Sequence, residues 1–156
     1  MLVQTINEKR TTQDQPQLPY PNDALRNDLI RVREIWRQSR RRHDRFSVYE
    51  YLAAVFDLVM VWQKENRAID RAKRALRIMG LESGDKVEPF AVVIKCTSSR
   101  KKVDAKARSK WVRALMYAAE TKAPSEPLGH FIQRIGGINK CASDPSRLGP
   151  SQPPAR

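Results

Sequence analysis

Apolar residues recur every three or four positions along most of this chain, which is the spacing of amphipathic helices. The first such segment covers about 23–42, and Asn22 is a suitable N-cap for it. Its apolar positions form one stripe, made of Leu25, Leu29, Val32 and Trp36.

A second helix is predicted over 47–79. Ser47 and Glu50 have the spacing of a capping box, in which each side chain accepts from a backbone amide of the first turn. Phe46 and Tyr51 stand where a hydrophobic staple would pack. The seam of this helix contains Val48, Leu52, Val55, Val59, Trp62, Asn66, Ile69 and Leu76.

Only the short link 43–46 separates these two helices. Because short links join antiparallel neighbours, the sequence predicts a helical hairpin over 22–80.

The rest of the patterned chain, 86–142, is expected to form a cluster of shorter helices. Residues 89–97 are ambiguous, because Val92, Val93 and Ile94 would suit a strand while Pro89 suits the first position of a helix. A helix is preferred, since no second strand is evident for pairing.

Two clearer helical segments follow. Asp104 is a suitable N-cap for a helix over 105–121, with Trp111 and Leu115 facing inward. A short helix around Phe131 should end at the Gly136–Gly137 pair, and 138–142 can add a last turn.

The overall prediction is an all-α fold with one domain. A length of 156 residues suits one domain with tails. Residues 1–21 are rich in Gln, Thr and Pro, and 143–156 are rich in Pro and Ser, so mobile or disordered tails are expected on either side of a helical domain at 22–142.

Charge is the most unusual property of the composition. Thirty Lys and Arg residues oppose seventeen Asp and Glu residues, which gives a net charge of +13. Such a surface attracts polyanions. Arg outnumbers Lys, and a guanidinium can bind phosphate through two hydrogen bonds, although codon bias in a GC-rich genome could also produce that ratio.

Three predicted helices carry basic residues on a shared face. Solvated faces usually mix signs, because like charges one turn apart cost a few tenths of a kcal/mol. A single basic stripe is weak evidence for a binding surface, and Glu34, Glu65 and Asp70 interrupt these faces. Three stripes of the same sign nevertheless favour a binding surface. They contain Arg33, Arg37, Arg40 and Arg41; Lys64, Arg67, Arg71 and Arg74; and Lys106, Lys110, Arg113 and Tyr117.

Residues 89–121 also permit a helix-turn-helix layout, in which the second helix enters the major groove and the run Ser98–Lys102 grips phosphates. The connection is longer than usual and has no Gly, so an ordinary packed helix with a solvated outer face is the competing interpretation.

The sequence contains no recognisable motif for catalysis or for metal binding. His43, His130, Cys96 and Cys141 do not have zinc-ligand spacing, and no Gly-rich phosphate loop is present. Asp57 within an apolar helix could have a raised pKa, but it more simply lies at the solvent boundary. The expectation is a protein that is not an enzyme and that needs no cofactor or metal.

The same patterns bear on location. Two distant Cys residues do not suggest a disulfide framework, and 1–15 lack the apolar core of a secretory signal. The longest apolar stretch, 51–62, contains Asp57 and is too short to span a bilayer. A cytoplasmic protein with no membrane partner is expected.

The functional expectation is a nucleic-acid-binding protein, with DNA favoured over RNA. The alternative is a protein–protein adaptor or inhibitor that dimerises or grips a helix through the hairpin and turns its basic faces toward an acidic partner. Asn66 would then set the register of the pairing. The candidate nucleic-acid-binding residues are Arg40, Arg41, Arg42, Arg67, Arg71, Arg74, Arg100, Lys101, Lys102, Lys106, Lys110 and Arg113.

Overall fold

The computed structural model describes residues 22–42, 44–99 and 101–143, and within these it contains seven α-helices and no strand. The all-helical prediction is therefore confirmed. The predicted tails, 1–21 and 143–156, lie outside the described residues, apart from Ser143. In order, the helices are α2 (Asn22–Arg42), α3 (Arg45–Lys64), α4 (Ala68–Ile78), α5 (Pro89–Thr97), α6 (Ala105–Thr121), α7 (Leu128–Ile135) and α8 (Ile138–Ala142).

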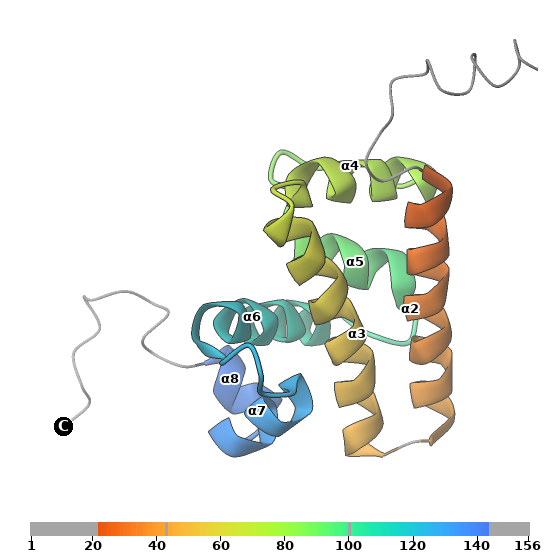
Figure 1. The fold of residues 1–156 in the computed structure, drawn as a ribbon. Helices are drawn as coiled ribbons and strands as arrows, with labels where there is room; N and C mark the ends of the chain where they lie inside the picture. The colour runs from red at the N-terminus through yellow and green to blue at the C-terminus, as the bar shows by residue number, and fades with distance from the viewer. Residues whose placement is uncertain (1–21, 43, 100, 144–156) are drawn as a thin grey trace, which may run out of the picture.

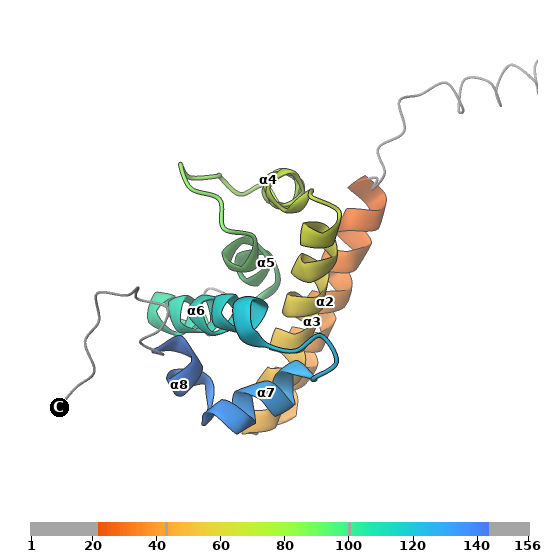
Figure 2. The same cartoon turned by 60° about the vertical axis from the view of Figure 1, so that its left-hand side comes forward.

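Helices α2 and α3 lie side by side, and the shorter helices gather on one side of this pair (Figures 1 and 2). The predicted apolar stripe of α2 is buried as expected, from Leu25 to Trp36. It packs on α3, whose Leu52, Val55 and Val59 are fully buried. Burial of these faces removes apolar surface from water and supplies most of the driving force for the fold.

Helix α5 lies at the centre of the molecule, against α2, α3, α4 and α6. The preference for a helix here was correct: Pro89 occupies the first turn, and the Glu88 carboxylate accepts from the amide of Phe90 at 2.6 Å. Seven of its nine residues are buried. Phe90 stacks on Phe56 with ring centroids 5.9 Å apart, which fixes α5 against α3.

The second predicted helix starts earlier than the capping box implied. Asp44 is the N-cap, and its carboxylate accepts from the amide of Ser47 at 2.7 Å. The Ser47 amide is taken by Asp44, and the Glu50 carboxylate forms an ion pair with Arg42 at 2.8 Å, so the predicted Ser47–Glu50 box does not form. Phe46 is half exposed and contacts Tyr49, so the predicted staple with Tyr51 is also wrong.

The same predicted helix does not continue to residue 79. It ends at Lys64, where Asn66 adopts a left-handed φ of 57°, and a new helix begins at Ala68. The amide of Arg67 donates to the carbonyl of Trp62 at 2.9 Å, which is the closing bond of a Schellman turn. Asn66 is exposed in this turn and is not a seam residue.

The break shifts the buried face of the following segment, although Leu76 of the predicted seam is buried as expected. Ile69, expected inside, is 47% exposed, whereas Arg71, expected at the surface, is 2% exposed. The Arg71 guanidinium forms an ion pair with Glu65, which the break has brought alongside it. Arg71 therefore has a structural place in the core.

Candidate nucleic-acid interface

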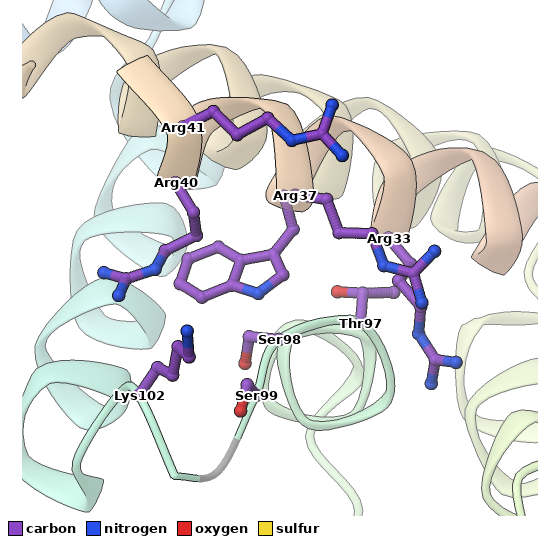
Figure 3. Close-up of a pocket in the computed structure, with 9 residues that line it drawn as sticks. Arg33, Arg37, Arg40, Arg41, Thr97, Ser98, Ser99 and Lys102 are labelled. Carbon is purple, nitrogen blue, oxygen red and sulfur yellow. The ribbon is translucent and has the colours of Figure 1, made fainter. Parts of the chain in front are cut away.

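A cleft of about 470 Å³ separates the C-terminal half of α2 from the end of α5 and the loop that follows it (Figure 3). We call it the basic cleft. Five of its lining side chains are cationic and three carry a hydroxyl. It is lined by Arg33, Trp36, Arg37, Arg40, Arg41, Thr97, Ser98, Ser99 and Lys102.

The arginines reach the cleft because of the helical repeat of α2. Side chains three and four residues apart lie on the same face, so Arg33, Arg37, Arg40 and Arg41 form a row. Trp36, within the same turns, is 6% exposed and anchors this part of α2 to the core. The stripe that the sequence predicted on this helix thus lies along one wall of the cleft.

The opposite wall is the C-terminal end of α5. Arg33 donates from Nη2 to the carbonyl oxygen of Cys96 at 2.8 Å, so one arginine of the row also ties α2 to α5. The Thr97 hydroxyl donates to the Val93 carbonyl, and Ser98 donates to Ile94. Thr97 Oγ1 also accepts from the Tyr51 hydroxyl at 2.7 Å, and both Thr97 and Ser98 are buried. With their protons directed at the helix, neither hydroxyl is free to donate to a phosphate.

Most of the cations in the cleft form no ion pair with a carboxylate of the described residues. Within the described residues, no carboxylate forms an ion pair with Arg33, Arg40, Arg41 or Lys102. Arg37 lies 3.7 Å from Glu34, in an exposed pair of the kind that contributes little. The guanidinium of Arg40 lies over the ring of Trp36, 5.7 Å from its centroid. The cleft therefore has a net positive charge available to an anion.

A second hollow of about 460 Å³ adjoins the basic cleft and shares Trp36, Arg40 and Lys102 with it. We call it the aromatic slot, because the half-buried ring of Trp111 lines it. Its other lining residues are Ser39, Asp44, Val48, Val103, Asp104 and Ala107.

Both carboxylates of the slot cap helices. Asp44 caps α3, and hydrogen bonds from Ser47 lower its pKa below the usual value. Asp104 caps α6 by accepting from the amide of Ala107 at 2.7 Å. The slot therefore places negative charge beside the cations of the basic cleft.

The structure brings three of the candidate binding residues together in the basic cleft: Arg40, Arg41 and Lys102. Lys101 is exposed in the same loop, and Arg100 lies outside the described residues. Arg42 forms an ion pair with Glu50 of α3 at 2.8 Å and does not line the cleft.

The candidates on α4 lie at the other end of α2. Arg74 donates to the side chain of Asn22, the first residue of α2. At 1.5 Å per residue, Asn22 is about 27 Å along the helix from Arg40. Arg67 pairs with Asp70 at 3.5 Å, and Arg71 is buried. The stripe predicted over the end of helix two is therefore separate from the basic cleft.

The stripe on α6 is partly covered by the C-terminal helices. Tyr117 packs on Phe131 of α7, with ring centroids 5.7 Å apart. Arg113 donates to the Ser109 hydroxyl and, at 3.3 Å, to the carbonyl of Ala142 in α8. Lys106 is exposed and Lys110 is half-buried, and neither lines the cleft. These contacts weaken the helix-turn-helix interpretation, which needs this face of α6 open to a major groove.

The twelve predicted binding residues do not include Arg33, Arg37, Thr97, Ser98 or Ser99. Arg33 and Arg37 belong to the predicted basic stripe of α2, and Ser98 and Ser99 belong to the run expected to contact phosphates. Nothing in the sequence indicated Thr97 or the meeting of this run with α2, because that depends on how α5 packs.

Among the described residues, no helix combines the length and the apolar character that crossing a membrane requires. In comparisons with family models, curated proteins and solved structures, the chain matches none.

Proposed function

We propose that this protein is a non-enzymatic nucleic-acid-binding protein that holds the phosphate backbone in the basic cleft, with DNA the first candidate. One observation carries the proposal. Four arginines of α2 and Lys102, far apart in sequence, line one cleft, and no carboxylate of the described residues forms an ion pair with Arg33, Arg40, Arg41 or Lys102.

The chemistry of these groups suits phosphate. Guanidinium groups match two phosphate oxygens at once, and ammonium adds a point charge. The net charge of +13 would also raise the rate of encounter with a polyanion. A cytoplasmic location is part of the proposal, and Cys96 and Cys141, which are both buried, are compatible with a reducing compartment.

The test is a binding titration with random-sequence duplex DNA across a salt series. Each neutralised phosphate adds about 0.9 to the slope of log K against log salt for duplex DNA, and about 0.7 for a single strand. Lys102→Gln and Arg41→Gln should each lower the slope by about one such unit. Lys73→Gln and Arg77→Gln, on exposed positions of α4, are the matched controls and should leave the slope unchanged within about 0.3.

Binding that does not respond to salt, or no binding at low salt to either duplex or single-stranded DNA or RNA, would contradict the proposal. If the α4 control variants lower the salt slope as much as the cleft variants do, binding depends on net charge alone and the basic cleft is not the binding site.

A homodimer or adaptor surface is the second candidate, and a different feature favours it. An apolar groove of about 370 Å³ runs between α2 and α3, lined by Val32, Ile35, Leu58 and Val61 among others. Val61 is 52% exposed, and Ile30 on α2 is 55% exposed. A second copy could cover this face, so sedimentation over a concentration series should find a dimer that Val61→Glu abolishes. Sedimentation as a monomer at every concentration would contradict the dimer.

A further inference from the structure

We infer that the basic cleft and the aromatic slot together hold one nucleoside phosphate, with its phosphate among the arginines of α2 and its base in the slot beside Trp111. The inference rests on the proposed function and adds a base-recognition site to it. The ligand is either a free nucleotide or one unit of a polynucleotide strand, because both present the same chemistry.

Continuity of the two hollows is the first support. Trp36, Arg40 and Lys102 line both, so the two hollows adjoin and one ligand can contact both at once. Each hollow, at about 470 and 460 Å³, has the size of a small-molecule site. A phosphate alone would leave the slot empty.

The distribution of charge is the second support. The cleft end carries Arg33, Arg37 and Arg41, while the slot end carries the carboxylates of Asp44 and Asp104. A phosphate is attracted to the first end and repelled from the second. A neutral ring with hydrogen-bond donors fits beside the carboxylates, so the two ends fix the direction of a nucleotide.

The walls of the slot suit a flat ring. Val48, Val103 and Ala107 supply apolar surface, and the indole of Trp111 supplies an aromatic one. Trp111 is held in place by edge contacts with Trp36 and Tyr51, whose centroids lie 6.1 and 6.0 Å from its own. A fixed aromatic ring favours stacking with a base, because little side-chain freedom is lost on binding.

The carboxylates indicate which bases are preferred. Asp104 uses Oδ1 for its cap and has a second oxygen with which to accept another hydrogen bond. A carboxylate pairs with the exocyclic amino group of cytosine, whereas thymine has a carbonyl oxygen at the equivalent position. The slot should therefore favour cytosine over thymine, two rings of similar size.

The experiment compares oligo-dC with oligo-dT of equal length at neutral pH, following tryptophan emission. Trp62 is fully buried and lines neither hollow, so the change should come from Trp36 and Trp111. Wild-type protein should bind oligo-dC about five to ten times more tightly than oligo-dT, as expected for one or two good hydrogen bonds to a base edge.

Two variants separate the base from the phosphate. Asp104→Asn keeps a good N-cap but removes the negative charge, so it should bind both oligonucleotides more tightly and lose most of the dC preference. Trp111→Phe should retain the salt slope, lose affinity for both by about threefold or more, and lose most of the emission change. Thermal unfolding confirms that each variant is folded.

Free dCMP, free dTMP and inorganic phosphate identify the source of the ligand. Micromolar binding of dCMP but not of phosphate indicates a nucleotide site, and binding of oligo-dC alone indicates a unit of a strand; both outcomes support the inference. Equal, salt-dependent binding of oligo-dC and oligo-dT by wild-type protein would overturn the base site and leave the proposed function standing. Failure of both oligonucleotides and of free dCMP to bind would overturn the inference, and the proposed function would fall with it only if random-sequence duplex DNA and RNA also failed to bind.

Discussion

Arg33 donates a hydrogen bond of 2.8 Å from Nη2 to the carbonyl oxygen of Cys96, which joins the middle of α2 to the last turn of α5. The bond satisfies a carbonyl that the end of a helix leaves without an intrahelical partner. It also sets the width of the basic cleft, because Arg33 and the adjacent Thr97 belong to opposite walls. One side chain therefore links the stability of the fold to the geometry of the site.

Arg33→Ala should lower the free energy of unfolding by about 2 kcal/mol, the usual contribution of a hydrogen bond from a charged group. Arg37→Ala, one turn along the same helix, loses only an exposed pair with Glu34 and should cost less than about 1 kcal/mol. Chemical denaturation of both variants makes the comparison. Equal stability of the two would show that the bond to Cys96 contributes nothing.

Arg71 should matter for folding and not for binding. It is 2% exposed and ion-paired with Glu65, so Arg71→Ala should destabilise the protein by roughly 2 kcal/mol through the lost charged hydrogen bond and packing. The salt slope of DNA binding should stay at the wild-type value. A change in that slope, measured under conditions in which the variant is fully folded, would show that Arg71 contributes to nucleic-acid binding.

Asn66 should tolerate glycine better than alanine. Its φ of 57° lies in the left-handed region, which costs a residue with a Cβ roughly 1 kcal/mol or more. Asn66→Ala should therefore lower the free energy of unfolding by about 1 kcal/mol, while Asn66→Gly should stay within about 0.5 kcal/mol of wild type. Identical values for the two variants would contradict the turn between α3 and α4.

Glu126 should make the C-terminal helices sensitive to acid. Hydrogen bonds, chiefly from Arg134 and then from His130, lower the pKa of Glu126 from 4.5 to about 2. A lowered pKa in the folded state stabilises the protein above pH 4.5, and this contribution is lost as the pH falls from 4.5 through 2. The melting temperature of Glu126→Gln should be below that of wild type at pH 7 and approach it near pH 2. A constant difference over that range would exclude the carboxylate as the cause.

Much of the fold was predictable because it depends on local patterns. The stripe from Leu25 to Trp36 fixed the buried face of α2, and Pro89 correctly favoured a helix over a strand for α5. The break at Asn66 was missed, although Asn tolerates the left-handed region, because the apolar spacing runs on through it. Extending the helical phase across that break turned Arg71 outward in the prediction and Ile69 inward, the reverse of what the structure has.

The site was less predictable than the fold. The α2 stripe and the run Ser98–Lys102 were both visible as basic segments, but their meeting depends on how α5 packs against α2. No residue near Arg37 in the sequence indicates that Ser99 will face it across a cleft. Some basic residues predicted to bind on α4 and α6 instead make contacts within the protein. Arg71 forms an ion pair with Glu65, and Arg113 donates to the carbonyl of Ala142.

The most direct test of the basic cleft as the binding surface is the mapping of backbone amide chemical shifts in a ¹H–¹⁵N spectrum during titration with an oligonucleotide. The largest changes should fall in 33–41, in 97–99 and at Lys102, on the two walls of the cleft. Changes centred on α4, around Arg67 and Arg74, or on the outer face of α6, around Lys106 and Lys110, would contradict the account.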